Sequence, residues 1–244
     1  MATRGARGFG QYSGVARAIE RVGERWALLI VRDLLVGPRR YSDLKAALPR
    51  IPTNILSDRL KELQESGVIR RVPTVRGGYE LTDLGRALEP VIVALERWGW
   101  AVLGEQGDND LVTPDALAIA LRAAFRPDAA AGMPPTEYVL HVGGVSVAAV
   151  VVNTSLDVVP IGPDALPQPR RPGPEPAFEA ALEFAVDPVG FRDLLAGRLD
   201  AGAVPILTGD LESVVRFTRT FRIDPVDPST DESGAAGAAE ASVA

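Results

Sequence analysis

Three polar side chains lie at the N-terminal end of a helix predicted over residues 53–66: Thr53, Asn54 and Ser57. An asparagine amide can form two hydrogen bonds with adenine, and serine or threonine hydroxyls can pair with either kind of base edge. The leucines of this helix recur at spacings of three and four and form one apolar face: Leu56, Leu60 and Leu63. Lys61 lies outside this face. The polar side of the helix is therefore suited to hydrogen bonding with nucleic-acid bases.

Basic side chains flank this helix in the sequence. Residues 38–76 hold 9 basic and 4 acidic side chains, and arginines there suit DNA phosphates or the minor groove. The candidate DNA contacts in these flanking segments are five arginines and one serine: Arg39, Arg40, Ser42, Arg70, Arg71 and Arg76. The net charge of the chain is −6, yet residues 1–107 carry +5 and residues 108–244 carry −11. A basic half in an acidic chain indicates nucleic-acid binding by that half, although each residue alone also fits an ordinary solvated surface.

The elements that would position these residues follow from periodicity and helix-end signals. Helices are predicted over residues 15–22, 25–36, 42–48 and 53–66, and strands over 68–72 and 79–81. Ser42 is the expected N-cap of the third helix, Gly67 ends the fourth, and residues 73–78 form a turn. Two helices joined by a tight turn and followed by a basic hairpin predict a winged helix-turn-helix domain over residues 15–103.

A long helix is expected from its N-cap Thr82 to about Leu103, with a kink at Pro90, where one backbone hydrogen bond is lost. Apolar side chains form a broad stripe along it: Leu84, Leu88, Val91, Ile92, Leu95, Trp98 and Val102. A small helical domain does not need so many apolar residues, so the stripe predicts a homodimer with two-fold symmetry. The alternative is that the stripe packs on the C-terminal half of the same chain.

The spacing of apolar residues along the chain changes after a polar linker at residues 104–110. Helices are predicted at 114–125, 188–196 and from Asp210 to about 221, and strands at 137–142, 145–152, 156–159, 180–186 and 205–207. Gly143-Gly144 is a hairpin signal, and seven prolines at residues 160–176 exclude a helix or a central strand. Residues 111–223 therefore predict an α+β domain with an antiparallel sheet. Residues 1–14 and 224–244 are expected to be flexible.

Several classes of function are disfavoured. The chain has no cysteine and one histidine, His141, which excludes thiolate metal sites and multi-histidine sites within one chain. No serine in a nucleophile-elbow motif accompanies His141, and the aspartates at 187, 193, 200 and 210 are explained as helix caps or helix surface. We therefore expect no catalytic residue, no metal and no cofactor. Without a secretory signal or a membrane-length apolar run, a cytoplasmic protein is expected.

Two segments carry a resemblance to a known family: RVGERWALLIVRDLLVGPRRYSDLKAALPRIPTNILSDRLKELQESGVIRR and YELTDLGRALEPVIVALERWG. Over residues 15–99 the chain resembles the HxlR-type winged helix-turn-helix regulators, which are related to the MarR group. The resemblance implies a dimeric transcription regulator with its recognition helix at 53–66 and its wing at 70–81. Many such proteins carry a cysteine for redox or electrophile sensing before the first helix, where this chain has Tyr12-Ser13-Gly14.

Residues 111–223 resemble the sterol-carrier-protein (SCP2-like) fold in the order and length of their elements. The end of the domain, Leu207-Thr208-Gly209-Asp210-Leu211 followed by a helix with Phe217 and Phe221, carries this similarity. The resemblance implies an apolar cavity between sheet and helices for a hydrophobic small molecule. Its expected lining is Phe125, Leu140, Val150, Phe178, Phe184, Phe191, Leu195, Leu207 and Phe217, although these residues could instead fill an ordinary core.

The sequence thus predicts a homodimeric transcription regulator that binds double-stranded DNA and responds to a hydrophobic effector. A second hypothesis is a lipid or small-molecule carrier whose winged helix contacts other proteins. A third is an enzyme that uses His141 as a base.

Overall fold

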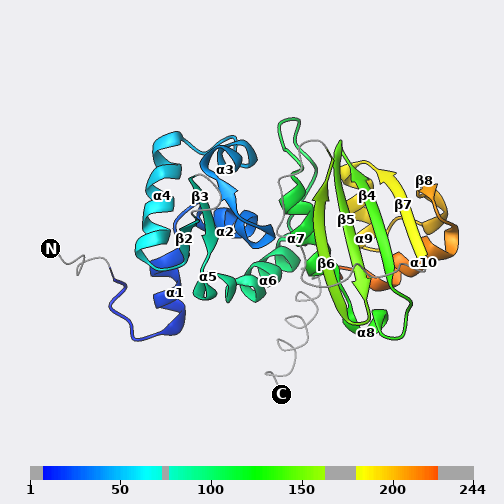
Figure 1. Cartoon of the computed structure of the whole chain (residues 1–244), viewed down its shortest axis with the longest axis horizontal. Coiled ribbons are helices and arrows are strands. Elements are labelled where there is room, and N and C mark those ends of the chain that lie inside the picture. Colours follow the sequence, from blue (N-terminus) through cyan, green and yellow to red (C-terminus); the bar gives the residue numbers. More distant parts are fainter. Residues whose placement is uncertain (1–7, 73–76, 163–179, 225–244) are drawn as a thin grey trace, which may run out of the picture.

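The computed structural model describes residues 8–72, 77–162 and 180–224. Helices α1–α6 surround a small sheet in one half, and a larger sheet forms the other half, with α7 between them (Figure 1). The arrangement is α+β, as predicted. Several expectations fall on residues outside the described ranges: most of the flexible N-terminus, the C-terminal tail, most of the turn at 73–78, most of the proline-rich segment at 160–176, Arg76 and Phe178.

The helices of the first half follow their sequence signals closely. They are α1 Gly14–Val22, α2 Ala27–Val36, α3 Tyr41–Ala47 and α4 Thr53–Glu65. The α2 helix begins two residues later than predicted because Trp26 has a left-handed backbone with φ of 81°. The α3 helix begins at Tyr41, so Arg40 rather than Ser42 is its N-cap. Gly67 follows α4 with φ of 74°, the conformation expected of a glycine after a helix.

A three-stranded sheet in the order β1-β3-β2 supports these helices. Its strands are β1 Arg39–Arg40, β2 Ile69–Val72 and β3 Gly78–Leu81. The sequence predicted the β2–β3 hairpin but missed β1, since two residues carry no periodic pattern. In β1, Arg39 lies opposite Tyr79 and Arg40 lies opposite Gly78. Successive side chains of a strand point to opposite faces, so Arg39 is buried and Arg40 is exposed.

The long helix predicted from Thr82 to Leu103 is instead two helices, α5 Asp83–Arg86 and α6 Glu89–Trp100. Thr82 does cap the first, because its side chain accepts a hydrogen bond from the backbone N–H of Gly85. Pro90 lies in the first turn of α6, where a backbone N–H has no acceptor within the helix, so the lack of an N–H in proline costs no helical hydrogen bond. The proline therefore marks a new helix start rather than a kink.

The larger sheet has the strand order β6-β5-β4-β7-β8. Its strands are β4 Thr136–Val142, β5 Val145–Val152, β6 Ser155–Ile161, β7 Ala180–Val186 and β8 Ile206–Thr208. Gly143 and Gly144 both have positive φ and close the β4–β5 hairpin, as predicted. The expectation of a purely antiparallel sheet is wrong, because β7 pairs with β4 in parallel. Pro160 lies in β6, at one edge of the sheet.

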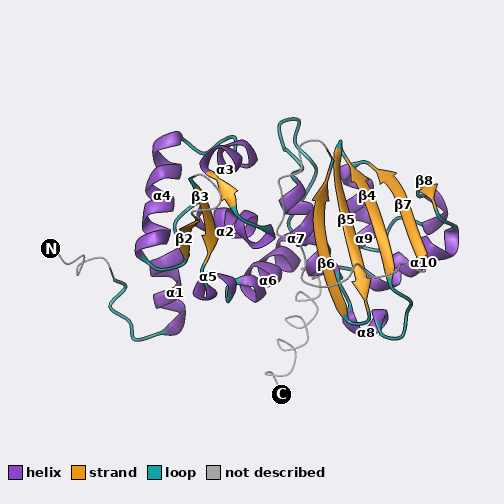
Figure 2. Cartoon of the chain, viewed as in Figure 1, coloured by secondary structure: helices purple, strands orange, loops and turns teal. Residues whose placement is uncertain are grey.

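Helices cover one face of this sheet, and Figure 2 shows its other face toward the viewer, with no helix of the described residues over it. The helices of this half are α7 Pro114–Ala124, α8 Pro127–Ala130, α9 Pro188–Leu195 and α10 Leu211–Thr220, with a 3-10 turn at Ala201–Ala203. Thr113, Asp187 and Asp210 cap α7, α9 and α10 through their side chains, and the two aspartates were expected to do so.

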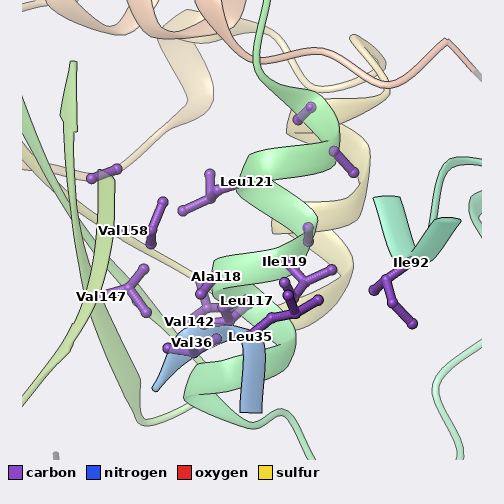
Figure 3. Packing of buried hydrophobic residues seen from close by; sticks show 14 of the residues in the cluster. Leu35, Val36, Ile92, Leu117, Ala118, Ile119, Leu121, Val142, Val147 and Val158 are labelled. Atoms are coloured by element: carbon purple, nitrogen blue, oxygen red, sulfur yellow. The ribbon is translucent and has the colours of Figure 1, made fainter. Parts of the chain in front are cut away.

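The α7 helix packs against both halves of the protein. In Figure 3, Leu117, Ala118 and Leu121 lie toward strand residues of the large sheet, whereas Ile119 lies toward Leu35 of α2 and Ile92 of α6. All of these side chains belong to one continuous hydrophobic cluster. The two halves that the sequence separates at the linker are therefore joined through a common core.

Buried charges reinforce this junction. The guanidinium of Arg39 in β1 donates two hydrogen bonds to the carboxylate of Asp115 in α7, at 3.1 and 2.5 Å. Asp33 of α2 is fully buried and accepts from Arg32 at 2.8 Å. Burial raises the pKa of Asp33 to about 6; Arg32 opposes this shift and the charge of Asp115 adds to it. Two carboxylates and two arginines thus lie together where α7 meets the first half.

We expect Asp115→Ala to lower the free energy of unfolding by about 3 kcal/mol, because it leaves the Arg39 charge buried without its partner. Urea denaturation followed by circular dichroism measures this change. The control is Glu80→Ala, which breaks the Arg70–Glu80 pair, in which Arg70 is 67% exposed, and should cost less than about 1 kcal/mol. Equal small losses in both variants would contradict a structural role for the buried pair.

Asp33 makes stability depend on pH. Because its pKa in the folded protein is raised from 3.8 to about 6, the folded form holds this proton to higher pH than the unfolded form does. The contribution of Asp33 to the free energy of unfolding therefore falls as pH rises from about 4 to about 6, by up to about 3 kcal/mol. The stability of the wild type relative to Asp33→Asn should decrease between pH 4.5 and pH 7.5 in urea titrations. A constant difference would mean that Asp33 does not titrate in this range.

Candidate nucleic-acid interface

The α4 helix presents a polar face to solvent and an apolar face to the core. Thr53, Asn54, Ser57 and Lys61 are all exposed. The leucines predicted for the other face are buried: Leu56, Leu60 and Leu63. The helix is thus oriented with its polar N-terminal residues outward, the orientation that contact with base edges in a DNA groove requires.

The turn between α3 and α4 is fixed by hydrogen bonds that the sequence analysis did not identify. The hydroxyl of Tyr41 donates to the backbone carbonyl of Thr53 at 2.9 Å, which ties the start of α3 to the start of α4. The ammonium of Lys45 donates to the carbonyls of Pro49 and Ile51 at 3.0 and 2.8 Å. These contacts hold the exposed end of α4 in a fixed position relative to α3.

Arg39 does not belong to this surface. Its side chain is only 2% exposed and is occupied by Asp115, so the prediction that it contacts DNA is wrong. Its neighbour Arg40 is exposed beside α3, and the backbone N–H of Arg40 bonds Asp43 at 2.7 Å. Ser42, in the first turn of α3, is also exposed. The structure therefore keeps one arginine of the Arg39-Arg40 pair on the surface.

The hairpin arginines are exposed, and each contacts a residue of β3. Arg70 donates to Glu80 at 2.7 Å, and Arg71 donates to the hydroxyl of Tyr79 at 3.0 Å. The guanidinium of Arg71 also lies 5.0 Å from the centre of the Tyr79 ring. Arg71 is therefore oriented by an aromatic residue of the adjacent strand and keeps its positive charge at the surface.

The apolar stripe of α6 divides into an exposed part and a buried part. Val91, Leu95, Trp98 and Val102 are exposed, Trp98 to 62% and Val102 to 64%. Ile92 is buried in the core of its own chain, so its assignment to a dimer contact is wrong (Figure 3). Leu88 is half-buried against the same core. Within the described residues an unpaired apolar surface thus remains along one side of α6.

Most residues expected to line a ligand cavity instead pack together. Leu140, Phe184, Leu195 and Phe217 are fully buried, and the Phe184 and Phe217 rings meet edge to face at 5.2 Å. Phe125 packs at the margin of this core, 5.8 Å from Phe221, and Leu207 is exposed. Val150 lies on the sheet face opposite to Leu140, because residues of a strand alternate between faces. Phe191 lies apart from this packed group and lines a cavity together with residues of α6 and α7.

His141 lies in a polar cluster on the face of the sheet that points away from α7, α9 and α10. Its Nδ1 is 2.7 Å from the Ser146 hydroxyl, and its Nε2 is 2.8 Å from the Glu183 carboxylate. The sequence analysis did not pair Ser146 with His141. The register of the β4–β5 hairpin places the two residues opposite each other. Ser146 lies within a strand paired on both sides, unlike a serine in a strained nucleophile elbow. The cluster is a cross-strand hydrogen-bond network.

The α4 helix lies in a part of the chain that is similar to known proteins. The model of the HxlR-like helix-turn-helix family matches residues 21–107. The chain is 43% identical over 86 residues to YvaP, an uncharacterized HTH-type transcriptional regulator of Bacillus subtilis; the match covers 34% of this chain and 80% of that protein. An uncharacterized HTH-type transcriptional regulator of Mycobacterium tuberculosis is 43% identical over 112 residues, which cover 44% of this chain and 65% of that protein.

Solved structures match about a third of the chain. The quinone-bound form of YodB from B. subtilis is 33% identical, covering 35% of this chain and 92% of that chain with a TM-score of 0.32. The redox regulator HypR in its reduced form is 26% identical, covering 38% of this chain and 95% of that chain with a TM-score of 0.35. None of the helices in the described ranges combines the length and apolar content that crossing a bilayer requires.

Proposed function

Because the chain belongs to the HxlR-like helix-turn-helix family of transcriptional regulators, we propose that it acts as a homodimer on double-stranded DNA. The observation that carries this proposal is the outward polar end of α4. Thr53, Asn54 and Ser57 are exposed there, while the opposite face of the helix is buried. Asn54 would read base edges in the major groove, and the two hydroxyls would add contacts to bases or backbone.

Positive charge around α4 supports the same assignment. Arg40 lies beside α3, Lys61 lies further along α4, and Arg70 and Arg71 lie on the hairpin. These side chains would neutralise phosphates and fix the position of α4 on the DNA duplex without contacting the bases. The acidic second half of the chain would be repelled by DNA, so the charge asymmetry also orients the protein on the duplex.

A second copy of the chain is the proposed occupant of the exposed α6 surface. Val91, Leu95 and Trp98 recur at spacings of four and three along one side of α6, and Val102 follows two residues after the end of the helix. Leaving a tryptophan and three aliphatic side chains in water is unfavourable, and a two-fold axis would bury each set against its equivalent. Such a dimer would present two α4 helices to two half-sites of a pseudo-palindromic operator.

For the C-terminal half, we propose a sterol-carrier-like fold that senses a hydrophobic small molecule. The order of helix, strands and closing helix supports this fold, and the apolar surface shared with α7 supports communication with the DNA-binding half. The alternative of a carrier without DNA binding is not favoured, since the relatives are HTH-type transcriptional regulators. For the same reason an enzyme based on His141 is not proposed.

Two substitutions separate phosphate contacts from base contacts. Arg40→Ala should weaken binding to all duplexes alike and reduce the slope of log affinity against log salt by about one per lost phosphate contact. Asn54→Ala should instead reduce discrimination between operator and scrambled DNA by about 1–3 kcal/mol, with the salt slope unchanged. Fluorescence anisotropy with the DNA upstream of the gene, at two salt concentrations, measures both effects.

The contrast between the two variants is the control for this experiment, since both residues are exposed. An unchanged affinity and slope for Arg40→Ala would contradict its phosphate contact. An unchanged preference for Asn54→Ala would contradict base reading by α4. Failure of the wild type to bind either duplex at low salt would contradict the proposed function itself.

We expect Leu95→Glu to convert the dimer to a monomer of 25.9 kDa, because it places a charge in the proposed apolar interface. Operator affinity should fall at least about tenfold, since the two DNA-binding halves would no longer be linked. Light scattering coupled to gel filtration measures the mass. The matched control is Leu207→Glu, at an exposed leucine of β8, which should leave the mass unchanged. A monomeric wild type would contradict the dimer.

A further inference from the structure

An open hollow of about 400 Å³ lies beside the N-terminal half of α4. It is lined by residues 24–26, which lead into α2, and by the residues at positions 50, 52, 55 and 59. Ser57 lies on the side of α4 that faces α3, with its hydroxyl 3.5 Å from the hydroxyl of Tyr41. Arg59 follows two residues later and therefore lies about 200° further around the helix. The hollow thus occupies the flank of α4 opposite to α3.

Two of the three arginines in this hollow keep their charge available. Arg59 is already paired with Glu24, at 3.2 Å. Arg25 is exposed, and no carboxylate forms an ion pair with it in the part of the chain that the structure describes. Arg50 is 67% exposed and lies 3.5 Å from Asp110, which is also exposed. An ion pair between exposed groups is weak, so an incoming anion can replace Asp110 at Arg50.

Arg25 lies against the ring of Trp26. Its guanidinium is 5.1 Å from the ring centre, within the range of a cation–π contact. Trp26 has a backbone φ of 81°, a conformation that a bulky residue rarely adopts, and its half-buried ring packs on the core. Such a conformation persists only where the surrounding fold imposes it. The charge of Arg25 is therefore held at a defined position at the edge of the hollow.

A helix that enters the major groove lies between two phosphate backbones. The groove is about 12 Å wide, and an α-helix with its side chains is about 10–12 Å across. Asn54 is exposed between the two flanks of α4, so when it points at the base edges, each flank faces the phosphates of one strand. Arg40 is exposed on the side of α3. Arg25 and Arg50 are the available cations in the hollow on the other flank.

We propose that this hollow is a second phosphate-contact site, in which Arg25 and Arg50 bind the DNA backbone on the strand opposite to the one that Arg40 contacts. The inference rests on the proposed function, because the position of the hollow beside α4 identifies DNA as the source of the phosphate. It extends the DNA-contacting surface from the helix-turn-helix and the hairpin to the segment that leads into α2.

The salt dependence of DNA binding tests the site. Arg25→Gln and Arg50→Gln should each weaken binding to operator and scrambled DNA alike and reduce the slope of log affinity against log salt by about one. Arg25→Lys keeps the charge and should keep the slope. Both arginines are exposed, so the variants should fold. The matched control is Arg219→Gln, the same change at an exposed arginine of α10, which should leave the slope unchanged. Fluorescence anisotropy with labelled DNA from upstream of the gene measures these slopes.

Neutral phosphate analogues locate the contact on the duplex. Each duplex of a set carries one methylphosphonate, which removes the charge of a single phosphate. At one position per half-site the wild type should bind at least about threefold more weakly, and this loss should vanish in Arg25→Gln, where the contact is already gone. The position whose loss vanishes in Arg40→Ala should lie on the other strand.

Three results overturn the inference and leave the regulator assignment intact. The first is a wild-type slope in both glutamine variants. The second is that no methylphosphonate position loses its effect in Arg25→Gln, or that the positions of Arg25 and Arg40 share a strand. The third is competition by inorganic phosphate at constant ionic strength that Arg25→Gln abolishes without a change of slope, which would assign the hollow to a free anion. A wild type that binds neither duplex at low salt overturns the proposed function and this inference together.

Discussion

The paired charges of Arg39 and Asp115 set a constraint on everything around them. A guanidinium and a carboxylate removed from water are tolerated only when each satisfies the other, and these two do so through two hydrogen bonds. To meet, β1 must lie against the start of α7, and α7 must lie against α2 and α6. The two halves of the chain therefore cannot adopt independent positions without exposing a common core and separating a buried ion pair.

This junction gives the α7 helix two roles. Toward the large sheet it supplies apolar side chains that close one face, and toward the first half it covers Leu35 and Ile92 (Figure 3). Two further polar contacts follow the same boundary, from Arg122 to Glu89 at 2.9 Å and from Arg97 to the carbonyl of Ala123 at 2.7 Å. The surface expected to meet DNA and the surface expected to meet a second copy both border elements that α7 holds in place.

Sequence patterns correctly predicted the elements that depend on interactions between residues close together in the sequence. The α4 helix, its apolar face, Gly67 and the glycine hairpin all depend on residues within a few positions of each other, and all were predicted. A few failures are local, such as the cap of α3 and the helix start at Pro90, but the failures that affect the site concern partners distant in sequence. Arginine is a residue type that commonly contacts DNA, but Arg39 is buried by a strand pairing and by an aspartate 76 residues away. Ile92 and the parallel β4–β7 pair likewise depend on elements far along the chain.

Pro160 has a consequence for how this protein associates with itself. It lies in β6, whose outer side has no neighbouring strand among the described residues, and a proline offers no backbone N–H to an incoming strand. At the opposite edge, β8 is only three residues long. Both margins of the large sheet are therefore poor templates for strand addition between molecules. Growth into ribbons or aggregates through exposed sheet edges is disfavoured, even though β4, β5 and β7 are rich in residues that favour such pairing.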